Sequence, residues 1–177
     1  DATYTFSQPQ GEWMALDYDT KGWKTGKAAF GTEDNPYRST PWQDGDIWVR
    51  RSFDWPEGTA KESLFLQYSH DDNIELYVNG QQVAATGNGL DYDLLKEIPQ
   101  DIANTLKPTG NILAAHCRNN GGGAYVDMGI MKKVKRGDTF DNKAVQKSVT
   151  VMPTQTYYTF ECGPVELDLI FTAPMLM

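Results

Sequence analysis

The stretch Ile74-Glu75-Leu76-Tyr77-Val78-Asn79-Gly80 decides the fold, and it lies within a segment, Asp46 to Asp127, that reads as one short strand after another. Apolar and polar side chains alternate up to Val78 with the period of two that is typical of a half-buried strand. Asn79-Gly80 supplies the residue types that adopt positive φ in a type I′ turn, and Gln81 to Ala84 is then the returning strand. The stretch therefore predicts a β-hairpin.

Three more apolar runs on either side of this hairpin predict further strands: Ile47 to Phe53, Leu64 to Tyr68 and Ile112 to Cys117. Helical periodicity is nearly absent from the chain. The one helical segment that we expect, Ile98 to Leu106, has Pro99 where a first helical position tolerates it. The pattern predicts an all-β fold, a jelly-roll β-sandwich with polar loops at its ends, and a sandwich of this kind is usually a binding module.

A polar connector, Lys132 to Asp138, is the best candidate for a domain boundary. We expect residues 1–135 to form the sandwich, and residues 136–177 to hold the connector and the first strands of a truncated second β-rich domain. These strands lack partners for a complete sheet, so we expect them to pair with something absent or to dock on the first domain. They are Ala144 to Met152, Thr154 to Glu161 and Val165 to Phe171.

Composition and charge argue against nucleic-acid binding and against a membrane span. The 177 residues carry a formal net charge of -8 with a pI near 4.7, which would repel a phosphate backbone and excludes nucleic acid. No apolar stretch approaches the roughly 20 residues of a membrane span, so we expect neither a membrane span nor a signal peptide in these residues. The hydrophobic fraction of 40% is enough for a real core. Because the chain begins at Asp1 and stops at Met177 inside an apolar run, we expect it to be a piece of a longer protein.

The two cysteines, Cys117 and Cys162, are too few for a disulfide framework and show no metal-ligand spacing. We favour two free, buried thiols over a single bridge between them. The sequence leaves both arrangements open.

Catalytic residue types are scarce, because only His70 and His116 are general bases near neutral pH. Cys117 follows His116 directly, but neighbours on a strand face opposite ways, so we do not expect a nucleophile and base pair. Ser69-His70-Asp71 has the residue types of a triad, yet triads assemble from separated segments. We therefore assign no catalytic residue to this chain.

We predict no cofactor and no metal centre, and a structural Ca²⁺ is the open alternative. The loop Gly31 to Pro36 could bind Ca²⁺ together with Asp44 and Asp46, although its spacing matches no defined calcium loop. The neighbouring carboxylates Asp71 and Asp72 could share a proton or hold a cation. We favour an arrangement in which one of them caps the loop backbone and the other is solvated.

Sugar binding is the better functional interpretation of the polar loops. Aromatic faces stack on sugar rings while carboxylates, amides and arginine bond the hydroxyl groups, so both kinds of residue must share one loop end. Structural roles compete with this reading: Trp48 is more often a core residue, Arg50 more often pairs with an internal carboxylate, and Asn73 more often fixes a turn. The candidate ligand-binding residues are Trp42, Asp71, Asp72, Asn73, His116, Asn119 and Tyr125.

Several segments resemble the sugar-binding domain of family 2 glycoside hydrolases, which is a galactose-binding-like jelly roll. The resemblance implies a β-sandwich and a carbohydrate-binding type of module. The segments that carry it are Trp48 to Phe53, His70 to Asn73, Tyr77 to Gly80 and Gly110 to Ala114.

A narrower set of segments resembles the N-terminal part of bacterial proteins of the glutaminase A-like family. In those large exported proteins, a galactose-binding-like module precedes a second β-rich domain and an α-helical toroid. The resemblance implies an extracytoplasmic location and a parent that hydrolyses the glutamine side-chain amide, while no catalytic residue of that family maps onto this chain. The segments are Ser69 to Asn73, His116-Cys117, Gly122 to Tyr125, Ala144 to Val149, Thr154 to Thr156 and Phe171 to Pro174.

Three functional hypotheses follow. The leading one is a non-catalytic, carbohydrate-binding-like accessory module of an exported glutaminase A-like hydrolase, with a glycan and the parent's other domains as partners. The second is a purely structural module that packs on neighbouring domains and binds no small ligand. The third is a piece that contributes a hydrolytic residue such as His70 or Asp72 to an amidohydrolase or glycosidase active site completed elsewhere.

Overall fold

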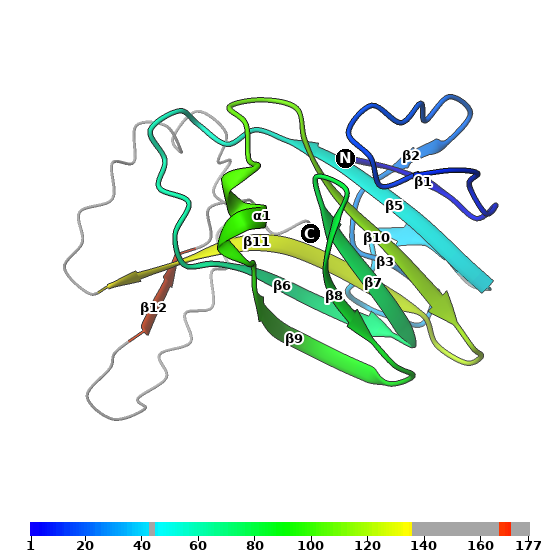
Figure 1. Ribbon diagram of the computed structural model, residues 1–177. Coiled ribbons are helices and arrows are strands. Elements are labelled where there is room, and N and C mark those ends of the chain that lie inside the picture. Colours follow the sequence, from blue (N-terminus) through cyan, green and yellow to red (C-terminus); the bar gives the residue numbers. More distant parts are fainter. Residues whose placement is uncertain (43–44, 136–166, 171–177) are drawn as a thin grey trace.

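The chain forms a two-layered β-sandwich, as the sequence predicted (Figure 1). The structure is a computed structural model that describes residues 1–42, 45–135 and 167–170. Sheet A contains, in spatial order, β2 (Lys24–Gly26), β1 (Ala2–Thr5), β5 (Gly45–Phe53), β10 (Asn111–Asn119), β7 (Asn73–Val78) and β8 (Gln81–Thr86). Sheet B contains β4 (Thr40–Pro41), β3 (Phe30–Gly31), β11 (Tyr125–Lys135), β6 (Leu64–Asp71) and β9 (Leu90–Glu97), and β12 (Leu167–Ile170) pairs with β11.

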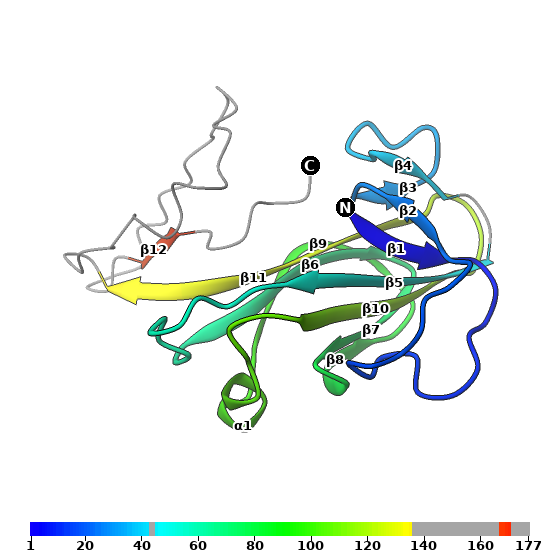
Figure 2. The ribbon, with the colours of Figure 1, turned by 90° about the horizontal axis from the view of Figure 1, so that it is seen from above.

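The hydrophobic core lies between the two sheets, whose strands Figure 2 shows from a second direction. Successive side chains of a strand point to opposite faces, so every second side chain points into the core between the sheets. On β7 the side chains of Ile74, Leu76 and Val78 are at most 1% exposed, whereas Glu75 and Tyr77 lie on the other face. The predicted period of two is confirmed at this strand.

The β7–β8 hairpin turns at Asn79-Gly80, where both residues have positive φ, 49° and 83°. This is the backbone conformation that the sequence predicted for the turn. Asn79 does more than turn the chain, because its Oδ1 accepts a hydrogen bond from Ile112 N at 2.9 Å and its Nδ2 donates to Thr105 O at 3.2 Å. The turn is therefore tied both to β10 and to the end of the only helix in the described residues, α1 (Gln100–Asn104), which starts after Pro99.

The outer face of sheet A is covered by residues 6–23, which connect β1 to β2 and are called the N-terminal strap below (Figure 2). Arg50 holds the strap in place: its Nη1 donates to the carbonyl oxygens of Trp13 and Ala15, and its guanidinium lies over the Tyr18 ring, 5.5 Å from the centroid. The expectation that Arg50 pairs with an internal carboxylate is wrong, since backbone carbonyls satisfy it. Strap residues and Trp48 form a second, smaller apolar cluster.

Two long strands of sheet B were not predicted. β9 lacks the alternation of a half-buried strand because almost all of its residues are exposed. β11 includes Lys132 to Lys135, which the sequence analysis had placed in a polar connector. That expectation is corrected by the ladder, in which Lys132 pairs with Leu64 of β6.

The predicted second domain lies largely outside the described residues, including the strands expected at 144–152 and 154–161. β12 falls within the strand expected from Val165 to Phe171, and it pairs with residues 132–135 of β11. The division of the chain at residue 135 stays a prediction. In the described part of the chain, no helix is long and apolar enough to cross a membrane.

Candidate functional site

Polar side chains from three connections meet at the end of the sandwich where β10 runs into β11 (Figure 1). Asn120 lies at their centre. Its backbone N–H donates to Asp72 Oδ2 at 2.6 Å, and its side-chain Nδ2 donates to the Oδ1 atoms of Asn73 and Asn88, each at 2.6 Å. We call Asp72, Asn73, Asn88 and Asn120 the rim cluster. It joins the β6–β7, β8–β9 and β10–β11 connections, which are far apart in the sequence.

The β10–β11 connection reaches Asp72 because of its glycines. Gly121 and Gly122 have φ values of 134° and 87°, which L side chains rarely adopt, and Asn119 Oδ1 accepts a hydrogen bond from Gly121 N at 2.8 Å. A Cβ atom at Gly123 would lie 3.3 Å from Asp71 Oδ2, a tight contact that shows how closely the two connections approach there. The glycine run is therefore a tightly bent loop.

The two neighbouring aspartates have different environments. Asp72 caps the loop backbone through Asn120 N, as favoured from the sequence. Burial raises the pKa of Asp71, and the adjacent charge of Asp72 raises it further. The two carboxylates thus share one acidic corner of the rim.

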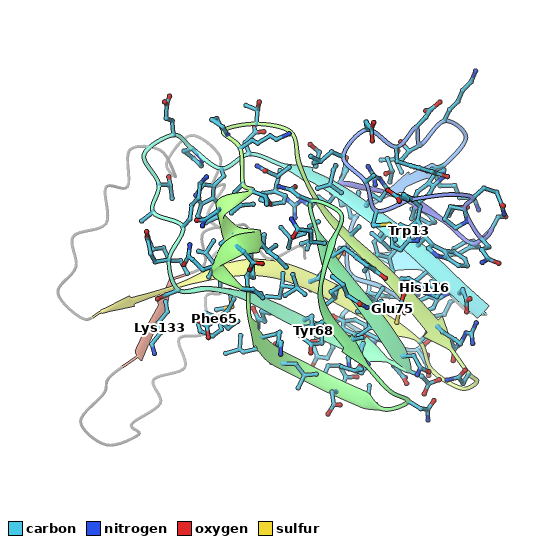
Figure 3. All side chains as sticks on the ribbon, in the orientation of Figure 1. Trp13, Phe65, Tyr68, Glu75, His116 and Lys133 are labelled. Atoms are coloured by element: carbon cyan, nitrogen blue, oxygen red, sulfur yellow. The ribbon has the colours of Figure 1, made fainter. Side chains whose placement is uncertain are left out.

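A second group of polar side chains lies next to the rim, on the outer face of sheet A. His116 is at its centre: its Nε2 lies 3.3 Å from Asp46 Oδ2 and its Nδ1 lies 3.5 Å from Glu75 Oε2. Its ring stacks on Trp48 with a centroid separation of 4.6 Å and an interplanar angle of 4°. Figure 3 shows His116 beside Glu75, on the same side of the sandwich as Trp13. We call Asp46, Glu75, His116 and Arg118 the histidine row.

Strand register produces the histidine row. His116 is directly opposite Trp48 of β5 and Glu75 of β7, and Arg118 is opposite Asp46 and Asn73 in the next outward-facing position. Since Arg118 O also accepts a hydrogen bond from Asp72 N at 3.0 Å, the row is continuous with the rim cluster.

The charges of the row are partly compensated. Arg118 donates from Nε and Nη2 to the two carboxylate oxygens of Asp46, at 3.0 and 3.4 Å. Burial raises the pKa of Asp46, but the hydrogen bonds from Arg118 and the proximity of the His116 ring outweigh that effect, so its pKa is lower than usual. Glu75 accepts a hydrogen bond from the Tyr77 hydroxyl at 3.0 Å, and burial followed by this hydrogen bond raises the pKa of Tyr77 to about 12.

The structure brings some of the predicted ligand-binding residues together and separates others. Asp71, Asp72, Asn73, Asn119 and His116 lie at the rim or in the adjoining row. Trp42 is 1% exposed and belongs to the core, and Tyr125 is 7% exposed with its ring 5.7 Å from that of Tyr92 on sheet B. Neither ring offers a free face for stacking in this conformation. The ligand-binding role of the whole set stays a prediction.

Within the described part of the chain, His70, Ser69, His116 and Cys117 do not assemble into a nucleophile and base. His70 is fully buried, with Nδ1 2.7 Å from Asp72 O and Nε2 3.1 Å from Thr86 Oγ1. Ser69 Oγ accepts a hydrogen bond from Asp93 N on the opposite face of β6. Likewise Cys117 points into the core, where burial raises the pKa of its thiol to about 12, while His116 points outward. Cys117 is a free thiol, and Cys162 lies outside the described residues.

The suggested calcium loop is engaged in other contacts. Asn35 Oδ1 accepts a hydrogen bond from Tyr37 N at 2.9 Å, Glu33 O accepts one from Arg38, and Asp46 is held by Arg118. Among residues 1–42, 45–135 and 167–170, no group of three or more His, Cys, Asp or Glu side chains could hold a metal ion. Asp44 lies outside the described residues.

Five members of the two groups were not predicted from the sequence: Asp46 as a partner of His116, together with Glu75, Asn88, Arg118 and Asn120. The alternation of β7 already placed Glu75 on the outward face, so its exposure was predictable. The meeting of Asn88 and Asn120 has no local signal, because it depends on how two distant connections fold over the same end.

Comparisons with known proteins identify the fold. No protein-family model and no curated protein matches the chain. Among solved structures, the β-glucuronidase of Parabacteroides merdae, with glycerol in its active site, is similar with a TM-score of 0.52 and 12% identity, over 76% of this chain and 23% of that one. A calcium-binding mutant of Bacteroides uniformis β-glucuronidase 2 gives a TM-score of 0.47 and 17% identity, over 71% and 17% of the two chains. A β-glycosidase from Bacteroides vulgatus gives 0.44 and 14%, over 72% and 19%.

At these identities the likeness shows the fold alone. The chain spans less than a quarter of the length of each of these three enzymes. Nothing in the comparisons supports the resemblance to glutaminase A-like proteins, which stays a prediction.

Proposed function

We propose that this chain is a non-catalytic, carbohydrate-binding-like accessory module of a larger exported hydrolase. The observation that carries the proposal is the continuity of the rim cluster with the histidine row at one end of the sandwich. Carboxylate, amide, imidazole and guanidinium groups are gathered there, on the outer face of central strands of sheet A and the loops that follow them. This is the chemistry that recognises sugar hydroxyl groups.

Exposure decides which groups meet the ligand. The side chains of Arg118 and Glu75 are 57% and 46% exposed, so they are the first donor and acceptor that a sugar reaches. Asp46 and His116, at 21% and 22%, lie deeper and hold the first two in position. Trp48 is covered by His116 and acts as a support for the imidazole, whereas Tyr77 contributes its ring edge beside Glu75.

The site is a surface patch. The small cavity between β1, β3, β5 and β11 is lined by residues such as Phe30, Arg51 and Val126, and it includes no member of the rim cluster or the histidine row. A patch of this kind buries little of a ligand, so we expect weak affinity for a single sugar and stronger binding for an oligosaccharide that spans several positions.

The identity of the parent protein is the less specific part of the proposal. The fold likeness to one part of the P. merdae β-glucuronidase supports a glycosidase type of parent. The sequence resemblance supports a glutaminase A-like parent outside the cytoplasm. In both cases the module itself supplies no catalytic group.

Calorimetric titration of the full chain with a panel of neutral and acidic oligosaccharides tests the sugar-binding function. Arg118→Ala and Glu75→Gln each remove a charged hydrogen-bonding group, so each should weaken binding by about tenfold. Lys107→Ala is the matched control, because Lys107 is exposed and lies between α1 and the start of β10, whereas the rim cluster lies where β10 ends. If Arg118→Ala, Glu75→Gln and Lys107→Ala all bind with the affinity of the wild type, the ligand binds at another place on the molecule.

A purely structural module is the second candidate, and one observation favours it. Asn120 already donates hydrogen bonds to Asp72, Asn73 and Asn88, as residues that only fix loops do. If no sugar in the panel binds the wild-type chain while these four positions are needed for thermal stability, the structural function replaces the sugar-binding one.

A further inference from the structure

Strand β9 is an edge strand of sheet B that no other described strand covers. It is the last strand of sheet B, and in the described part of the chain it pairs only with β6. Figure 1 shows it at the border of the fold, with no other labelled element beyond it. An edge strand exposes a row of unpaired backbone N–H and C=O groups that a further strand can bond.

The apolar side chains of β9 are unusually exposed for a single strand. In the described residues, five large hydrophobic side chains are exposed, and three of them lie here: Leu90 at 53%, Tyr92 at 49% and Leu95 at 50%. Leu90 and Leu95 pair with the outward-facing positions of β6, and Tyr92 contacts Tyr125 on the same outer face. They form one apolar strip along the free edge, and such strips mark interaction surfaces.

The sequence of β9 is complementary to itself. When two copies of Leu90–Glu97 run antiparallel about the midpoint between Asp93 and Leu94, Asp91 of one copy lies opposite Lys96 of the other, and Tyr92 lies opposite Leu95. A two-fold axis produces each of these pairs twice. Opposite charges and apolar side chains that face each other directly across strands stabilise the pairing.

The faces agree with this register. Asp91 and Lys96 pair with the core-facing residues His70 and Leu66 of β6, so both belong to the inner side of the strand, while Tyr92 and Leu95 both lie on the outer side. A bulge at Asp93, with a φ of 54°, interrupts the strand at its centre. The residues on either side of the bulge, 90–92 and 95–97, therefore form two short ladders around the axis.

We infer that β9 is a homodimerisation edge, at which a second copy of this chain adds its own β9 antiparallel and joins the two B sheets. This inference is independent of the proposed sugar-binding function, because β9 contributes no member of the rim cluster or the histidine row. A dimer would present two such sites and favour ligands that span both.

Charge reversal tests the inference on the full chain by sedimentation velocity over a series of concentrations. The wild-type chain should associate to a dimer as its concentration rises. Lys96→Asp places two carboxylates opposite each other at both ends of the interface. Asp91→Lys places two ammonium groups opposite each other at the same two positions. Each substitution should therefore weaken association by about tenfold or more. Lys21→Asp, an equal charge change on the exposed strap, should leave association unchanged.

Mixing the variants provides the decisive result. An equimolar mixture of the Lys96→Asp and Asp91→Lys proteins restores an attractive pair at each end, and the double variant D91K/K96D does so within one protein, so both should dimerise again. Circular dichroism confirms that every variant is folded. A wild-type chain that stays monomeric, or a dimer that the single reversals do not weaken, would overturn the inference.

Discussion

At the scale of single residues, several buried polar side chains are satisfied by backbone groups and side chains of other strands and connections. Asn111 is fully buried, and its side chain accepts from Asn79 Nδ2 and Lys107 N while donating to Phe53 O and Lys107 O. His70 and Arg50 are buried in the same way, each bonded to backbone oxygens. In the sequence His70 suggests catalysis and Arg50 suggests an ion pair. Their contacts show that both hold strands and connections together, as Asn111 does.

Asp127 is the residue whose titration should affect stability most clearly. Burial raises its pKa to about 7, although the Met128 N–H and Arg51 act in the opposite direction. Its ordinary pKa of 3.8 applies in the unfolded chain. Because the folded state binds the proton more tightly, this stabilisation is complete below about pH 4 and is lost as the pH rises towards 7.

Asp127→Asn should therefore gain stability relative to the wild type over that interval, by on the order of 2–4 kcal/mol in total. Urea unfolding of both proteins at pH values from 4 to 8 measures the difference. We expect the difference to grow up to about pH 7 and then level off. A constant difference across the series would contradict the assignment of the raised pKa to Asp127.

At the scale of elements, alternation predicted those strands that have one buried and one polar face, such as β7 and β10. It failed for β9, because an exposed edge strand buries neither face, and for the end of β11, where lysines follow the apolar residues. The N-terminal strap has no strand or helix pattern at all. Its position depends on Arg50, which lies in the middle of β5 and is 4% exposed.

Arg50→Lys should release the strap while leaving the charge in place. A lysine has no planar fork to hold the Trp13 and Ala15 carbonyl oxygens together, so we expect a loss of about 2 kcal/mol of stability and faster hydrogen exchange of backbone amides in residues 12–18. Mass spectrometry of peptides from exchanged protein measures the rate. Arg118→Lys is the control, because Arg118 bonds Asp46 outside the strap. Equal exchange rates of the strap amides in the two variants would contradict the anchoring function of Arg50.

At the scale of the whole molecule, both sheets contribute to one continuous core. Leu76 of sheet A and Leu66 of sheet B are each 0% exposed and belong to the same cluster of buried residues. The strap adds a second apolar layer on the far side of sheet A, so that sheet is enclosed on two faces over Trp48 and Ala114. The polar site lies where this cover ends.

Leu66→Ala and Leu76→Ala should each cost about 3 kcal/mol, because both leave a cavity in the shared core. Each variant should still unfold in one transition, with tryptophan fluorescence and circular dichroism giving the same midpoint. Tyr37→Ala, at a position that is 72% exposed, should change stability by no more than about 0.5 kcal/mol. Separate transitions for the two probes would show that the sheets do not share one core.

The sequence by itself determined the fold class, the β7–β8 hairpin and the strands with alternating faces. These features follow from local φ preferences and from the burial of every second side chain, which the order of residues records directly. Only the tertiary structure decided that Trp42 is buried, that Asp46 and Glu75 flank His116, and that Asn120 meets Asp72, Asn73 and Asn88. Those contacts join residues of different strands and connections, so they depend on strand register and on the packing of two sheets, which local patterns do not specify.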